Sequence, residues 1–258
     1  TVNNEVKRLG PSGDPILSAG GAGNRHITEI GSAIGSYYGY QTDGIYQNQA
    51  EIEAGPVDQI ATPRPGDFRW VDVNNDGFIN QDDRTVIGNY LPDFTYGITN
   101  TFSYENVSFS FLIQGVQGSE VLNLTRRHMG NGEANYNSYR DWVNRWVSES
   151  NPGNGEIPRA NRQTGNSNNR PSSYQVEDAS YIRLRNVTLA YTFPKSVLGN
   201  TFSGMRIAVT GTNLLTITDY LGYNPEVNNQ EDNLLVQGED YGSYPLQSTL
   251  TVGININF

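Results

Sequence analysis

The last ten residues of the chain alternate between apolar and polar side chains without a break. The apolar positions are Leu250, Val252, Ile254, Ile256 and Phe258, and the positions around them are Thr, Gly or Asn. A period of two is that of a β-strand, in which successive side chains point to opposite faces. The segment is therefore predicted to be a strand with one wholly apolar face. That face must meet either a protein core or lipid.

The same period recurs in residues 95–116, where it predicts a hairpin. Glu105 and Asn106 can form the tight turn between two strands of about ten residues each. The apolar phase consists of Tyr96, Ile98, Phe102, Tyr104, Val107, Phe109, Phe111 and Ile113. Strands of this length match the height of a tilted strand in a membrane barrel. A soluble sandwich can show the same alternation, but its strands are usually about half as long.

Two further strands are predicted over residues 182–193 and 205–216. In the first of them, Ile182 and Leu184 lie out of phase with the apolar residues that follow Asn186. Either a bulge near Asn186 shifts the phase, or the intervening arginines stand above the membrane.

Connections between the predicted strands alternate in length. Short turns follow residues 104 and 193, whereas long polar stretches span residues 118–178 and 218–246. Outer-membrane barrels have this asymmetry, with short periplasmic turns and long extracellular loops. In a compact soluble domain, structureless loops of this length would count against the strand assignment.

Aromatic residues in the first long stretch have helical spacing. Tyr139, Trp142, Val143 and Trp146 follow an i, i+3, i+4, i+7 pattern, which predicts a short loop helix. Its aromatic side chains would either contact a partner or ligand, or form a small core that holds the loop together. We favour the small core.

Composition supports an all-β chain and excludes several classes of function. The sequence has 28 Gly, 16 Tyr and 9 Phe residues and only 17% charged residues, a composition that favours strands and turns over helices. The formal net charge of -10 argues against nucleic-acid binding, which needs clustered Lys and Arg. No apolar run approaches the ~18 residues of a membrane-spanning helix. The mean hydropathy of -0.56 is compatible with the strands of a membrane barrel, because these alternate lipid-facing and lumen-facing residues.

Common catalytic residues and motifs are scarce in the sequence. It has no Cys and only two histidines, His26 and His128. It also lacks the nucleophile elbow, the zinc-protease motif and the glycine-rich phosphate-binding loops. The chain is therefore predicted not to be an enzyme, with no catalytic and no organic-cofactor site.

One segment follows the spacing of calcium-binding loops almost residue for residue. Its predicted ligands are Asp72, Asn74, Asp76, Phe78, Asn80 and Asp83. Gly77 would supply the sharp turn, and Phe78 would offer its backbone carbonyl. Calcium takes six to eight oxygen ligands, and residues 72–83 can provide them. The alternative is a turn rich in Asn and Asp that holds no ion.

The form of this loop indicates a structural role for calcium. Asp83 stands where helix-loop-helix proteins have Glu, and its shorter side chain resembles the calcium loops of extracellular dockerin-type repeats. No second copy of the loop and no long flanking helices are evident. The ion would therefore hold the loop in one conformation and would not act as a sensor.

The N-terminal residues show none of the features of an export signal. Residues 1–7 contain no charged leader followed by an apolar core and a cleavage site. We therefore expect the sequence to be the interior of a longer protein. A mature secreted domain whose signal has been removed is the alternative.

Several motifs in a fixed order resemble those of SusC/RagA outer-membrane proteins, the TonB-dependent transporters of Bacteroidetes. The first two are Gly35-Ser36-Tyr37-Tyr38-Gly39-Tyr40 and Asp43-Gly44-Ile45-Tyr46. Around the calcium-type loop lie Pro65-Gly66-Asp67 and Asp83-Arg84-Thr85-Val86-Ile87-Gly88. The later ones are Phe94-Thr95-Tyr96-Gly97, Gln114-Gly115, Asp178-Ala179-Ser180-Tyr181-Ile182-Arg183-Leu184-Arg185-Asn186, Gly211-Thr212-Asn213-Leu214, Tyr223-Asn224-Pro225-Glu226 and the terminal Phe258. Each motif alone is weak, but their order and spacing are specific.

This resemblance implies an all-β fold, an antiparallel transmembrane β-barrel segment with long extracellular loops. Residues 1–258 would be the C-terminal strands of a barrel of about 22 strands. The resemblance also implies an outer-membrane location and import of glycans or peptides. The partners would be the rest of the barrel and its plug domain, a SusD-like surface lipoprotein, TonB, an oligosaccharide or peptide substrate, and outer-membrane lipid.

A second function remains open at this point. The chain would then be a soluble, calcium-dependent surface adhesin or carbohydrate-binding domain. Detergent extraction separates the two, because an adhesin is soluble on its own, whereas a barrel segment needs detergent and its remaining strands.

Overall fold

The predicted hairpin forms in the computed structural model of the chain and begins its largest sheet. Strand β9 (Phe94–Tyr104) pairs with β10 (Val107–Gln117) along the full length of both strands. Glu105 lies in the turn between them, in the left-handed region with a φ of 49°. Each strand has 11 residues, which confirms the long strands predicted from the sequence.

The structure describes residues 5–20, 23–130, 132, 136–163, 167–199, 201–229 and 232–258. The first four residues of the N-terminal segment considered above lie outside the described residues. Within the described ranges, no helix combines the length and the apolar character needed to cross a bilayer.

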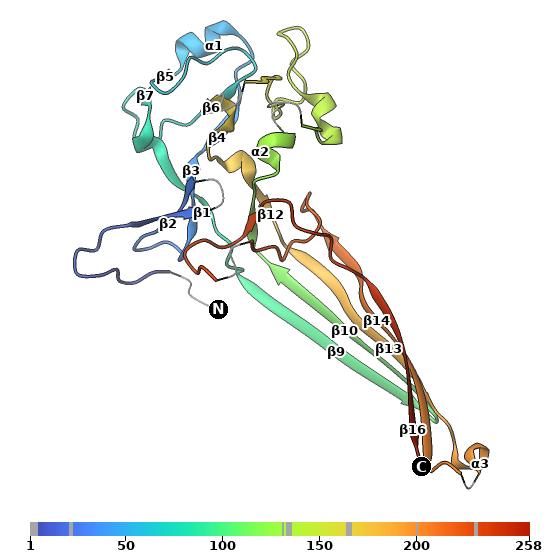
Figure 1. Ribbon diagram of the computed structural model, residues 1–258. Helices are drawn as coiled ribbons and strands as arrows, with labels where there is room; N and C mark the ends of the chain where they lie inside the picture. The colour runs from blue at the N-terminus through green and yellow to red at the C-terminus, as the bar shows by residue number, and fades with distance from the viewer. Residues whose placement is uncertain are drawn as a thin grey trace.

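Three more long strands extend the hairpin into a five-stranded antiparallel sheet with the order β16-β14-β13-β10-β9. They are β13 (Tyr181–Thr192), β14 (Gly204–Thr218) and β16 (Thr249–Asn257). Figure 1 shows the sheet as a long blade with α3 (Lys195–Leu198) and the C-terminus at its far end. The prediction of an all-β chain with strands in these three regions is confirmed.

Side chains sort by polarity between the two faces of this sheet. One row across it consists of Phe102, Phe109, Leu189, Val209 and Val252. The next row, on the opposite face, consists of Thr101, Ser110, Thr188, Thr210 and Thr251. Phe102 and Val252 are 56% and 63% exposed, so the apolar row is open to the surroundings. Monomeric soluble proteins rarely expose an apolar surface of this kind.

A bulge in β13 keeps this sorting intact along the strand. Its pairing with β10 skips a residue between Leu184 and Asn186, which leaves Arg185 as the extra residue. Ile182 and Leu184 therefore share the apolar face with the rest of the strand, and Arg183 points to the polar face. Of the two explanations for the phase change, the bulge is confirmed.

The rest of the described chain contains short strands and short helices joined by turns and loops. The strands are β1 (Ile16–Gly20), β2 (Gly23–Thr28), β3 (Ser36–Tyr40), β4 (Thr42–Ile45), β5 (Val57–Asp58), β6 (Phe68–Trp70), β7 (Phe78–Ile79), β8 (Arg84–Gly88), β11 (Glu120–Asn123), β12 (Val176–Asp178) and β15 (Glu239–Asp240). The helices are α1 (Gln49–Ala54), α2 (Arg126–Met129) and the 3-10 helices η1 (Gln81–Asp83), η2 (Arg140–Asn144), η3 (Ser167–Asn169) and η4 (Ser173–Gln175). β1, β2, β3 and β8 form a four-stranded sheet.

Most of the buried apolar side chains of the described residues lie in this loop-rich part, whereas the long sheet has few, among them Tyr181 and Ala190 of β13. One cluster consists of Tyr40, Ile45, Phe68, Trp70 and Ile79, with Trp146 and Tyr174 packed against it. Smaller clusters contain Val121 and Leu122. The loop-rich part therefore has its own hydrophobic cores, whereas the long sheet depends on its surroundings to cover its apolar face.

The two stretches predicted as long loops lie at the end of the sheet opposite α3 (Figure 1). Residues 118–178 contain β11, β12 and several short helices, and residues 218–246 contain β15. In place of the loop helix predicted over residues 139–146, the chain forms the 3-10 helix η2, which ends before Trp146. The Trp146 backbone N–H donates to the carbonyl oxygen of Ile157 at 3.0 Å. Of the four residues with helical spacing, Trp146 packs against the aromatic cluster, as the small-core interpretation predicted, whereas Val143 is 74% exposed.

Candidate functional site

The calcium-type loop connects β6 to β8 and contains β7 and η1. Three of its predicted ligands lie together at its start. The backbone N–H of Asp76 donates to Asn74 Oδ1 at 3.0 Å, and that of Gly77 donates to Asp72 Oδ2 at 2.8 Å. Gly77 has a φ of 85°, a conformation that favours glycine, which confirms the predicted sharp turn.

Asp83 and Asn80, the two predicted ligands at the end of the loop, bind its backbone. Asp83 is fully buried, and its carboxylate accepts the backbone N–H groups of Val73 at 2.9 Å and Asn80 at 2.8 Å. The Asn80 side chain accepts the backbone N–H of Asp82 at 2.7 Å and caps η1. The Asp83 side chain therefore ties the end of the loop to its beginning, and the Asn80 side chain orders the end itself.

The carbonyl of Phe78 lies on the side of β7 away from β5. The parallel pairing of these strands uses the carbonyls of Gly77 and Ile79, each 3.0 Å from its donor nitrogen on the other strand. Because alternate carbonyls of a strand point to opposite edges, that of Phe78 points the other way.

The loop offers oxygens of the chemical type that a hard cation binds, but few of them lie together. Asp72, Asn74 and Asp76 offer the carboxylate and amide oxygens that calcium prefers. Asp83 is already engaged with the backbone, and among the described residues no three Asp, Glu or His side chains converge as a metal site would require. Sequence spacing thus brings half of the predicted ligands together.

A buried ion pair lies on the polar face of the long sheet, at its loop-rich end. Arg183 of β13 has no exposed surface, and its guanidinium forms an ion pair with Glu226. Arg183 Nε donates to Thr216 Oγ1 at 2.9 Å, and Nη2 donates to Asn224 Oδ1 at 3.1 Å. The Tyr181 hydroxyl donates to the other Glu226 oxygen at 2.5 Å. The pair therefore fixes the long connection after β14 against the sheet.

The ion pair also controls the ionisation of Glu226. Burial alone would raise the pKa of its carboxyl group. The hydrogen bonds from Tyr181 and Arg183 and the charges of Arg183 and Arg185 outweigh burial and hold the pKa below its ordinary value. In the sequence, Tyr181, Arg183, Asn224 and Glu226 stand out only as parts of longer motifs. The out-of-phase arginines were the one signal that could have indicated a charged partner.

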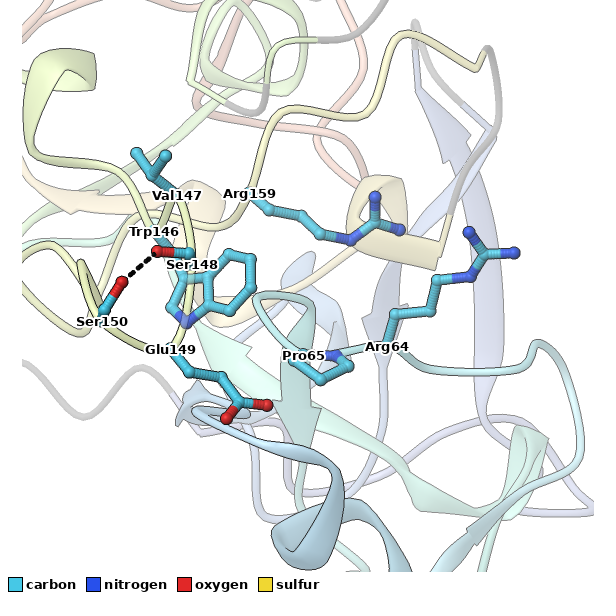
Figure 2. A pocket seen from close by; sticks show the side chains of 8 residues that line it. All are labelled: Arg64, Pro65, Trp146, Val147, Ser148, Glu149, Ser150 and Arg159. Carbon is cyan, nitrogen blue, oxygen red and sulfur yellow. Dashed lines mark hydrogen bonds between the residues drawn. The ribbon is translucent and has the colours of Figure 1, made fainter.

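A cavity of about 610 Å³ opens in the loop-rich part, and Figure 2 shows its walls. It is lined by Arg64, Pro65, Trp146, Val147, Ser148, Glu149, Ser150 and Arg159. Both arginine side chains reach to one side of the cavity, and the Glu149 carboxylate lies on the other (Figure 2). The cavity thus combines an aromatic surface with charged groups of both signs, an arrangement that local sequence patterns did not indicate.

The chain is similar in sequence to several TonB-dependent receptors. It is 40% identical over 267 residues to TonB-dependent receptor P3 of Formosa agariphila, and this match covers 99% of the chain but 26% of that protein. It is 25% identical over 270 residues to TonB-dependent receptor SusC of Bacteroides thetaiotaomicron, covering 99% of the chain and 23% of SusC. The chain therefore spans about a quarter of the length of these relatives. No protein-family model matches it.

The fold is similar to that of solved transporter structures. The RagAB peptide importer in its open-open state matches with a TM-score of 0.74 over 98% of the chain, which corresponds to 25% of the matched chain. The sequence identity is 22%, so this likeness shows the fold alone. It confirms the predicted all-β class, in which long antiparallel strands carry large loops.

Proposed function

Because the chain belongs to the SusC/RagA kind of TonB-dependent receptors, we propose that it forms wall and outer loops of an outer-membrane transporter for glycans or peptides. The main support for this proposal is the structure of the long sheet. One of its faces is apolar across all five strands, the other is lined by Thr and Ser, and its connections are short at one end and long at the other. This is the design of a strand wall between lipid and a wet interior.

The edges of the sheet support a place in a larger barrel. Within the described chain, β9 and β16 each pair with a neighbour on one side only. An open edge in lipid leaves backbone N–H and C=O groups without partners, and each such group costs several kcal/mol. We therefore propose that further strands of the same protein close the barrel and that its interior holds a plug domain.

The proposed partners follow from the names of the relatives. One relative is SusC and a structural neighbour is part of the RagAB peptide importer. By analogy, a SusD-like lipoprotein would cover the long loops, and TonB would act through another part of the whole protein. No catalytic step is proposed, since the relatives are named as receptors and an importer.

Expression of residues 1–258 alone tests this function against the alternative of a soluble calcium-dependent adhesin. We expect the isolated chain to aggregate without detergent, because nothing covers its apolar face or its strand edges. We expect the full-length protein to fractionate with the outer membrane and to show heat-modifiable migration in gels. A soluble, monodisperse product from the isolated chain, without detergent, would favour the adhesin.

We also propose that the loop of residues 72–83 binds calcium. The supporting observation is the cluster of Asp72, Asn74 and Asp76 oxygens beside the Gly77 turn. Asn80, Asp83 and the Phe78 carbonyl would complete the ligand set after a local rearrangement. The ion would hold β7 and η1 in place and would play no part in transport chemistry.

Calcium is expected to stabilise this loop in the full-length protein. At a calcium concentration 100 times the Kd, the gain would be about 2.7 kcal/mol. Limited proteolysis with and without millimolar calcium tests this stabilisation. We expect calcium to protect residues 72–83 from cleavage. Asp76→Ala should abolish the protection. The matched variant Asp82→Ala should retain it, because Asp82 is exposed and is not a predicted ligand. Equal protease sensitivity with calcium and with chelator would contradict the proposal.

A further inference from the structure

The cavity of Figure 2 has an aromatic wall that the backbone holds in place. A Cβ atom on Gly66 would lie 2.4 Å from the Trp146 ring, so only glycine lets this backbone lie so close to the indole. Gly66 has a φ of 88°, which also favours glycine. Its carbonyl accepts the backbone N–H of Arg159 at 2.7 Å, while Trp146 is tied to Ile157. The indole is thus pre-organised before any ligand arrives.

Asp67 neutralises one of the two arginines that line the cavity. Its carboxylate, 2% exposed, lies 2.8 Å from Arg159 Nε and accepts a hydrogen bond from Arg159 Nη2 at 3.2 Å. It also accepts the backbone N–H of Arg64 at 2.9 Å and the side-chain amide of Asn168 at 2.9 Å. The same carboxylate therefore fixes the Arg159 side chain and the Arg64 backbone.

Arg64 is exposed, and no acidic side chain among the described residues neutralises its charge. In the described part of the chain, its guanidinium forms no ion pair and no side-chain hydrogen bond. The carboxylate of Glu149 lies on the opposite side of the cavity (Figure 2). A guanidinium offers five donors in a planar fork that matches a carboxylate or a sulfate.

A smaller polar cavity of about 280 Å³ continues beyond the two arginines, which line both cavities. Its other walls are Ala61, Thr62, Asp67, Asn161, Gln163 and Ser167. The side chains around Arg64 are thus an indole on one side and hydroxyl and amide groups on the other. A ligand that fits both needs an apolar ring face, many hydroxyl groups and one anionic group.

We propose that this pair of cavities binds an oligosaccharide whose sugar ring stacks on Trp146 and whose anionic substituent, a carboxylate or a sulfate, binds Arg64. The hydroxyl and amide side chains beyond Arg64 would bind the hydroxyl groups of the next sugar. An acidic peptide could also reach Arg64 with a carboxylate, but it offers fewer hydroxyl groups to the polar walls of the second cavity than a sugar does. The proposal rests on the proposed function, since it takes these loops to meet imported substrate.

Calorimetric titration of the full-length protein in detergent tests this site. The probes are maltotriose, trigalacturonate and a singly sulfated galactotriose. We expect Arg64→Gln to weaken one or both acidic trisaccharides about 10- to 100-fold, the size of a lost charge-assisted hydrogen bond, and to leave maltotriose almost unchanged. The acidic probe that loses affinity identifies carboxylate or sulfate as the substituent. Glu149→Gln should strengthen acidic ligands, because it removes a like charge.

Two further variants separate ring stacking from general effects. Trp146→Ala should weaken all three trisaccharides about tenfold, and Trp146→Phe should restore part of the loss. Arg8→Gln is the matched control, because Arg8 is exposed and does not line either cavity. Circular dichroism in detergent confirms that each variant is folded.

Two results would overturn the proposal. One is an Arg64→Gln protein that binds the acidic trisaccharides as tightly as the wild type. The other is a short acidic peptide, Asp-Ser-Asp, that binds as tightly as trigalacturonate and loses the same affinity in Arg64→Gln. Binding by purified protein does not depend on location or transport. A failed fractionation experiment would therefore reject the proposed function without deciding the saccharide site.

Discussion

Replacement of Glu226 by Ala in the full-length protein is expected to destabilise the folded state by about 3–5 kcal/mol, the range for breaking a buried ion pair. The reason is the position of Arg183, which has no exposed surface and would keep its charge without a partner. Urea unfolding in detergent micelles, followed by tryptophan fluorescence, measures the change. Glu156→Ala is the control, since Glu156 is an exposed carboxylate that forms no ion pair among the described residues.

Replacement of Arg183, the other partner of the ion pair, should destabilise the folded state less. Arg183→Met leaves Glu226 behind, but that side chain is 32% exposed and lies 3.7 Å from Arg185, so water and a second cation remain available to it. A larger loss for Arg183→Met than for Glu226→Ala would show that the pair does not act as described.

The ion pair of Arg183 with Glu226 also makes the stability of the wild-type protein depend on pH. The pKa of Glu226 is lowered in the folded state, so its stabilisation is present above the ordinary glutamate pKa and is lost as the pH falls through the folded value. Glu226→Ala should flatten this part of the stability curve. If Glu226→Ala loses as much stability at acidic pH as the wild type does, other carboxylates cause that loss.

Replacement of Ile254 by Arg is expected to destabilise the barrel by about 2–4 kcal/mol, the depth-dependent range for a cation on the lipid face. Ile254 lies within β16, is 61% exposed and pairs with Ile207 on the apolar face. Unfolding of the full-length protein in lipid vesicles measures the effect. Thr251→Arg is the matched variant, because it places the same side chain on the same strand but on the polar face beside Thr210.

Equal losses at these two positions would count against a membrane wall. In a soluble sandwich, one face of the sheet would meet a protein core, so Ile254→Arg would be the more destabilising variant there as well. Repeating both unfolding measurements in vesicles of different thickness adds a second readout, because the cost at Ile254 depends on its depth in the bilayer.

The long sheet was predictable from the sequence because its pattern is local. An alternation of two residues over ten positions fixes strand, face and length at once, as in β9, β10 and β16. Even the bulge at Arg185 left a local sign, the change of phase after Leu184. The sequence left the cause of that change open, and the strand pairing decided it.

The loop-rich part was less predictable because its order comes from distant residues. Strands of two or three residues such as β5, β7 and β15 have no period to detect, and they pair with segments far along the chain. Residues 139–146 have helical spacing, yet tertiary hydrogen bonding draws Trp146 to Ile157 and limits the helix to one 3-10 segment.

The candidate sites, too, were predictable only where their residues lie close together in the sequence. The turn at Gly77 and the cluster of Asp72, Asn74 and Asp76 follow from spacing within one short segment. Contacts between remote segments, such as Arg183 with Glu226, could not be deduced from composition or periodicity.

The bulge at Arg185 also sets limits on how the length of this strand can change during evolution. Deletion of Arg185 alone would remove the extra residue and restore regular pairing with β10, with Ile182, Leu184 and Val187 still on the apolar face. Loss of one residue from a regular part of the strand, with the bulge kept, would turn every side chain beyond that point to the other face. A single-residue deletion in β13 should therefore be tolerated at Arg185 and not elsewhere in the strand, together with an adjustment in β14, which carries its own irregularity opposite the bulge.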